Sequence, residues 1–185
     1  MSVTQELAAR RPHRSDAARN FDAILTAART AFTDHGPQAS LDDIAKAAGV
    51  GVATLYRNFP SRGDLVEAVY AAEVDDLCRY GQRLLRTEPW QALVAWLRRF
   101  DSYLTTKRQL GDALDRETGD FRASRDALYT TGQQLLDRAR DAGRVRAEVS
   151  VDDLLRFFLG VATVPCRSKR QRERILALAI HAVEP

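Results

Sequence analysis

The chain has little of what most secreted, metal-binding and membrane-spanning proteins need. Its 185 residues include two cysteines, and no apolar run approaches the ~18 residues of a membrane-spanning helix. Cys78 and Cys166 form neither a Cys-x-x-Cys pair nor a zinc-ligand spacing. The first residues also lack the apolar core of a signal peptide. We therefore expect free thiols in a soluble, cytoplasmic protein with no membrane partner.

Histidine is scarce as well, and this bears on catalysis. The three histidines are His13, His35 and His181, which lie far apart along the chain. They give no nucleophile–base pair and no metal-ligand spacing. The sequence therefore predicts no enzyme, no catalytic residue, no metal site and no cofactor, although an enzyme is the leading rival class.

An excess of one charge is also missing. The 28 basic and 25 acidic residues leave a net charge of +3, which is unlike a histone-like coating protein. Any binding of nucleic acid must come from a local patch.

Periodic apolar residues are abundant, and they predict helices. Phe21, Ile24, Leu25, Ala28 and Phe32 recur at three- and four-residue steps, for example. The predicted helices cover about 15–35, 41–48, 52–58, 62–86, 90–106, 121–142, 151–164 and 168–183. No strand-like alternation and no internal repeat is visible, so the fold class is all-α with about nine helices.

Polar and turn residues divide this pattern into parts. Residues 1–14 are predicted to be a flexible basic arm, and Ser15 is expected to cap the first helix. Residues 15–62 form a three-helix domain, and residues 63–185 form a larger helical domain. We place the division near residues 60–65.

The most informative segment is SLDDIAKAAGVGVATLYRNFPSRGDL, residues 40–65. Two short helices are separated by a turn at Gly49, where glycine can take a left-handed conformation. Val50 then fills the angle between the helices. This is the pattern of a helix-turn-helix, whose second helix enters the major groove of DNA.

Residues 19–65 resemble the TetR/AcrR family of bacterial regulators. The resemblance rests on the first helix ending in AFTDHG, on SLDDIAKAAGV, and on TLYRNFPSRGDL. It implies a dimer that binds double-stranded DNA at a near-palindromic operator. It also implies a ligand-binding and dimerisation domain behind the helix-turn-helix, and a repressor that releases its operator when an unknown small-molecule effector binds. Most relatives repress, and a minority activate.

The resemblance also assigns DNA-contacting positions. Ser40, Tyr56 and Arg62 match positions that contact phosphates, and Val52, Ala53 and Thr54 match the base-facing surface. Arg57 is a candidate for a base or a phosphate, and the arm adds Arg10, Arg11 and Arg14. Gly51 stands where many relatives have serine, which leaves few groups for direct base readout and favours readout of DNA shape.

The second domain is expected to hold the effector and the dimer contact. Aromatic residues of this region are mostly core, but some could line a cavity: Trp96, Phe100, Tyr103, Phe121 and Tyr129. The helix 151–164 is apolar on more than one face, which favours a partner subunit. The predicted dimer residues are Leu154, Phe157, Phe158, Val161, Leu176 and Ile180. A second rival class is a helical interaction protein that has lost DNA binding.

Overall fold

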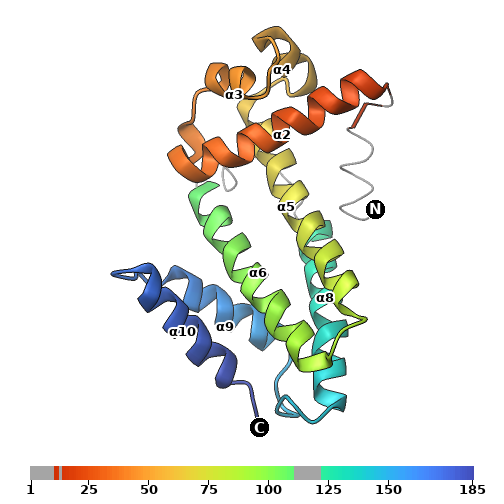
Figure 1. The fold of residues 1–185 in the computed structure, drawn as a ribbon, viewed down its shortest axis with the longest axis vertical. Helices are drawn as coiled ribbons and strands as arrows, with labels where there is room; N and C mark the ends of the chain where they lie inside the picture. The colour runs from red at the N-terminus through yellow and green to blue at the C-terminus, as the bar shows by residue number, and fades with distance from the viewer. Residues whose placement is uncertain (1–10, 13, 111–121) are drawn as a thin grey trace. The chain divides into compact units, whose positions relative to one another are not determined.

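The computed structural model describes residues 11–12, 14–110 and 122–185, and all of its regular structure is helical (Figure 1). These residues form eight α-helices and one 3-10 turn, with no strand among them. The all-α prediction is confirmed, and the described helices number eight where about nine were expected.

The first helices follow the capping signals of the sequence. α2 spans Ser15–His35 and ends at Gly36, whose φ of 71° opens the 3-10 turn η1, Gly36–Gln38. α3 spans Leu41–Ala47, and the Ser40 hydroxyl accepts a hydrogen bond from the Asp43 amide. The prediction for Ser15 is wrong in detail, because Arg14 holds the N-cap position and Ser15 is already helical.

The turn between α3 and α4 has a Schellman geometry. Gly49 has a φ of 69°, its amide donates to Lys46, and the Val50 amide donates to the carbonyl of Ala45. These two bonds satisfy carbonyls that the end of α3 leaves open. α4 then spans Val52–Asn58 at a fixed angle to α3.

A small apolar core holds these helices together. Phe21 of α2 packs against Phe59, with ring centroids 4.9 Å apart, and both side chains are buried. Ile44 of α3 and Leu55 of α4 are fully buried beside them. A helix as short as α4 is marginal alone, so this packing keeps it folded.

Two long helices follow, and each contributes to both compact units of the chain. α5 spans Arg62–Leu84 and α6 spans Pro89–Leu110. One unit comprises residues 1–75 and 106–124, and the other comprises 76–105 and 125–185. The unit that contains the helix-turn-helix includes the first part of α5.

The second unit is completed by three more helices. α8 spans Arg122–Asp141, α9 spans Val151–Thr163, and α10 spans Lys169–His181. α9 and α10 lie side by side within this unit (Figure 1). None of the described helices is long and apolar enough to cross a membrane.

Candidate nucleic-acid interface

α4 presents one side to the core and the other to solvent. Leu55 is fully buried, whereas Tyr56 keeps 47% of its surface exposed. Val52, Ala53 and Gly51 are exposed as well. The second helix of the helix-turn-helix therefore faces solvent. A helix that enters a DNA groove must be exposed in this way.

Gly51 leaves the start of α4 without a side chain. It occupies the N-cap position in an extended conformation, and a Cβ built on it would meet nothing within 4 Å. The backbone and the surroundings therefore tolerate a serine here. The absence of a side chain is a property of this sequence and not a demand of its packing.

Thr54 and Arg57 are bonded to each other. The Arg57 guanidinium donates from Nη2 to the Thr54 hydroxyl at 2.8 Å. The Thr54 carbonyl accepts a second bond from the Asn58 side chain, also at 2.8 Å. Thr54 is half-buried and Arg57 is exposed, so the pair orders an arginine on the surface of α4.

Two predicted phosphate-binding residues lie beside one another in the fold. Ser40 is exposed, and its oxygen accepts the Asp43 amide at 3.3 Å, which leaves its own O–H as a donor. Arg62 is half-buried and donates to the carbonyl of Ala39 at 2.6 Å. The sequence did not indicate this bond, which ties the start of α5 to the residue before Ser40.

The arm arginines differ in their surroundings. Arg11 donates to both carboxylate oxygens of Asp22 on α2, at 2.9 and 2.5 Å. These hydrogen bonds hold the pKa of Asp22 below its usual range. Arg14 is exposed at the start of α2, and Arg10 lies outside the described residues.

A groove runs between the start of α2 and α4. Its volume is about 660 Å³, and its polar lining residues are Arg14, Ser15, Asp16, Asn20, Thr54, Arg57 and Asn58. Sequence reasoning missed Asn20 and Asn58. Asn58 could have been found because it follows Thr54 by one helical turn, but nothing local connects Asn20 with α4.

The positive charge near this groove comes from a few individual side chains. Residues 1–75 contain eight Arg and Lys and ten Asp and Glu, so this part of the chain has no positive excess. Attraction to DNA must then come from a few well-placed arginines, as the overall composition suggested.

The residues predicted to contact an effector are mostly core. Trp96 is fully buried between α5 and α8, where a Cβ on Gly81 or Gly132 would come within 3.1 Å of its ring. Phe100 stacks on Trp96, and Tyr103 stacks on Phe100.

The remaining effector candidates are less enclosed or not described. Tyr129 is half-buried and donates its hydroxyl to Asp152 at 2.5 Å, which raises the pKa of the phenol. Phe121 lies outside the described residues. The Trp96 indole N–H has no hydrogen-bond partner among the residues that the structure describes.

The residues predicted for the dimer contact fall on two sides of the helices. Leu154, Phe158, Leu176 and Ile180 are buried within the single subunit and belong to its core. Val161 is half-buried, and Phe157 is 44% exposed. Sequence reasoning did not select Leu178 of α10, which is 68% exposed.

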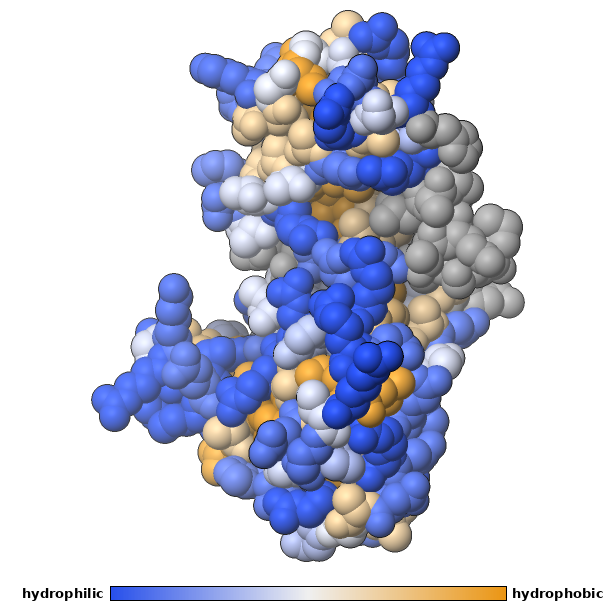
Figure 2. Space-filling model, turned by 45° about the vertical axis from the view of Figure 1, so that its right-hand side comes forward, coloured by the Kyte–Doolittle hydropathy of each residue, from blue (hydrophilic) through white to orange (hydrophobic). Residues whose placement is uncertain are grey.

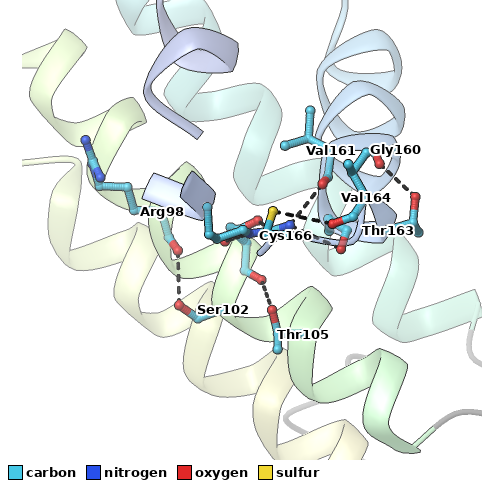
Figure 3. A network of polar contacts seen from close by, with 11 residues as sticks. Arg98, Ser102, Thr105, Gly160, Val161, Thr163, Val164 and Cys166 are labelled. Atoms are coloured by element: carbon cyan, nitrogen blue, oxygen red, sulfur yellow. Dashed lines mark hydrogen bonds and ion pairs between the residues drawn. The ribbon is translucent and has the colours of Figure 1, made fainter. Parts of the chain in front are cut away.

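An arginine joins three helices of the second unit near the end of α9, where Val161 and Thr163 lie (Figure 3). Arg172 of α10 forms an ion pair with Asp101 of α6, and both side chains are largely buried. Its Nη1 also donates to the carbonyls of Val161 and Ala162 at 2.9 and 3.2 Å. These carbonyls belong to the last turn of α9, so Arg172 caps that helix from its neighbour.

Other chemistry is not apparent in the described ranges. They contain no group of three or more His, Cys, Asp or Glu side chains placed to hold a metal ion. Cys78 and Cys166, both within the described ranges, are half-buried and form no disulfide. Over the face shown in Figure 2, hydrophilic residues prevail and hydrophobic residues gather in smaller patches.

Two family models match the chain. Residues 24–69 match the bacterial regulatory proteins of the tetR family, and residues 88–184 match the C-terminal domain of SbtR-like transcriptional regulators. Among curated proteins, the HTH-type transcriptional repressor LfrR of Mycolicibacterium smegmatis is 53% identical over 59 residues. That match spans 32% of this chain and 30% of the repressor's length.

Solved structures match over nearly the whole chain. The TetR transcriptional regulator SCO0520 from Streptomyces coelicolor is 38% identical with a TM-score of 0.79, over 89% of this chain and 98% of that one. A TetR regulatory protein from Mycobacterium vanbaalenii is 30% identical with a TM-score of 0.76, over 94% and 100% of the two chains.

These matches agree with the outward-facing α4 and the helical unit behind it. They place the protein among regulators and not among enzymes, which confirms that prediction. The chain belongs to the TetR family of DNA-binding transcriptional regulators.

Proposed function

We propose that this regulator is a homodimeric repressor that binds a near-palindromic operator and releases it when a small molecule binds. The similarity to a repressor over 59 residues favours repression. The operator lies on bacterial DNA, so we place the regulator in the cytoplasm. Each subunit would insert α4 into one of two successive major grooves, about one DNA turn apart.

The exposed face of α4 is the observation that carries this proposal. Tyr56 directs an exposed side chain outward from a helix whose other side is anchored by the buried Leu55. Ser40 keeps an O–H that can donate to a phosphate. Val52 and Ala53 offer apolar contacts to thymine methyl groups, and Arg57 adds charge.

Gel shifts with the regulator's own promoter test the DNA-binding part. Tyr56→Phe removes one hydroxyl from the exposed face, and Tyr80→Phe is the matched control because Tyr80 belongs to the second unit. We expect roughly tenfold weaker binding for Tyr56→Phe, the scale of one hydrogen bond to a charged phosphate. Equal retention of promoter and scrambled DNA by the wild type would contradict the operator.

We place the dimer contact on the outer stripe of α9. Phe157, Gly160 and Val161 lie along one flank of the helix, Val164 follows at its C-cap, and the buried Phe158 points about 100° away from Phe157. A Cβ on Gly160 would meet nothing within 4 Å, so the subunit itself does not require glycine there. Since glycine weakens a helix interior, close approach of a second copy explains its presence.

The mass of the protein in solution tests this contact. Phe157→Glu places a charge on the outer stripe and should give monomers at micromolar concentration. Leu159→Glu is the control, because Leu159 is equally exposed at 46% but lies about 200° around the helix from Phe157. Equal loss of dimer in both variants would show that the dimer contact does not lie on this stripe of α9.

Release by an effector rests on family membership and on the second unit. The buried Trp96 N–H is an open donor that an acceptor on a ligand could satisfy. A ligand releases DNA only through its different affinity for the bound and free states. Compounds that raise the melting temperature of the protein should then lower operator retention, and Tyr129→Phe and Trp96→Phe should shift their affinity.

A further inference from the structure

The inference concerns the groove between α2 and α4, and it rests on the proposed DNA binding. Thr54 and Arg57 both line this groove, together with Arg14 at the N-cap of α2 and Asn20 of α2. Family resemblance had placed Thr54 on the base-facing surface and left Arg57 open between a base and a phosphate. The structure joins the two side chains in one hydrogen bond.

We propose that Thr54 is a positioning residue for Arg57. Its hydroxyl holds the Arg57 guanidinium at the groove, where Arg57 and Arg14 bind a phosphate of the operator backbone. Thr54 contacts DNA through Arg57 and not by itself.

The hydrogen bonds of Thr54 support this role. Its hydroxyl accepts from Arg57 and its carbonyl accepts from Asn58, both at 2.8 Å, and the residue is half-buried. A free arginine loses many rotamers when it binds a ligand. An arginine already held by its neighbour loses fewer, and its planar fork keeps further donors for phosphate oxygens.

The composition of the groove favours an anion over a base edge. Two exposed arginines from different helices line it, with the amides of Asn20 and Asn58. The acidic side chain in its lining, Asp16, is in an ion pair with Arg19. An anion with several oxygens can accept hydrogen bonds from both guanidiniums.

Position along α4 points the same way. The exposed residues at the start of α4 are Val52 and Ala53, and the start of the second helix is where base edges are met. Arg57 lies near the other end of α4 and on the side that borders α2. We therefore assign base contacts to the start of α4 and a backbone contact to Arg57.

A double-mutant cycle with duplex DNA tests the assignment. The variants are Thr54→Val, which keeps the shape without the hydroxyl, Thr54→Ser, Arg57→Ala and the double variant Thr54→Val with Arg57→Ala. Affinity is measured from 50 to 200 mM salt on the operator and on scrambled DNA, and thermal unfolding confirms that each variant is folded.

The expected results are specific. Arg57→Ala should weaken binding roughly tenfold on both DNAs, and the slope of log affinity against log salt should fall by about 0.9. Thr54→Val should weaken binding about threefold alone and have no effect in the Arg57→Ala background. Thr54→Ser should bind like the wild type, because the hydroxyl returns.

Three results would overturn the assignment. Additive losses would show that Thr54 acts independently of Arg57. A changed preference at one base pair with an unchanged salt slope would show that Arg57 reads a base. Failure of Thr54→Ser to restore binding would show that the hydroxyl is not the acting group.

Failure of the proposed operator binding looks different. The wild type would then bind operator and scrambled DNA equally. The loss of salt slope in Arg57→Ala would still be measurable on either DNA, because a phosphate contact carries no sequence information.

Discussion

α4 and α9 are both helices with one side in the core and one side exposed, yet they are built differently. α4 has seven residues, begins at a glycine without a side-chain cap, and exposes Tyr56 and Arg57. α9 has thirteen residues, and Ser150 and Asp153 cap its N-terminus with a reciprocal capping box. It exposes Phe157 and Leu159 beside the charged Arg156.

The difference indicates what the exposed side of each helix contacts. The exposed face of α4 mixes Tyr56 and Arg57 with the small apolar Val52 and Ala53, and it needs little length because the groove contact involves a few residues. An apolar outer stripe is unfavourable in water unless a partner covers it. α4 therefore fits a reversible contact and α9 fits a lasting one.

The strongest test separates the two sides of α9. Phe158→Ala removes a fully buried ring and should lower the free energy of unfolding by about 3–5 kcal/mol. Phe157→Ala, its exposed neighbour, should change the unfolding of the subunit little but weaken the dimer. Urea unfolding at two protein concentrations separates these effects. Similar losses in both variants would break the distinction between an inner and an outer side.

A second test removes the contacts that Arg172 of α10 makes with the end of α9 and with Asp101. Arg172→Met leaves Asp101 unpaired and two carbonyls of α9 without their donor. Because removing one partner of a buried ion pair is costly, we expect a loss of about 3 kcal/mol in thermal or urea unfolding. Arg170→Met is the control, since Arg170 is exposed on the same helix. An equal effect of both would contradict the role of Arg172.

A smaller effect is expected from the cap of α9. Ser150→Ala removes the hydroxyl that accepts the Asp153 amide, and should lower stability by about 1 kcal/mol. Ser150→Thr should keep most of the cap. If Ser150→Ala unfolds like the wild type, the capping box does not stabilise α9. The difference in capping between α4 and α9 then has no effect on stability.

The smallest effect concerns the missing cap of α4. Gly51→Ser adds a hydroxyl in open space and should raise stability by a few tenths of a kcal/mol. It should also strengthen DNA binding in a gel shift by up to a few fold, if the hydroxyl reaches a phosphate. Weaker binding would show that the glycine itself is needed where DNA approaches.

The sequence predicted the helix-turn-helix well because its determinants are local. Gly49 and the Ser40 cap act within one or two turns, so spacing alone identifies them. The outward side of α4 follows from Leu55, which the same pattern placed in the core. The residues that contact DNA remain predictions.

Contacts between distant parts of the chain could not be read in the same way. α9 is apolar on more than one face, and the sequence does not say which face packs against its own subunit, so it does not distinguish Phe158 from Phe157. Arg172 and Asp101 are 71 residues apart, and no local signal connects them. Likewise, the partners of Arg62 and Arg11 exist only in the folded chain.

Selection of DNA from a random pool by the purified protein tests the central claim most directly. A dimer that uses α4 predicts enrichment of two half-sites related by a two-fold axis, with centres about one helical turn of 10–10.5 base pairs apart or a multiple of it. No enrichment, or a single half-site without its symmetric copy, would contradict a dimeric regulator that reads its operator through this helix.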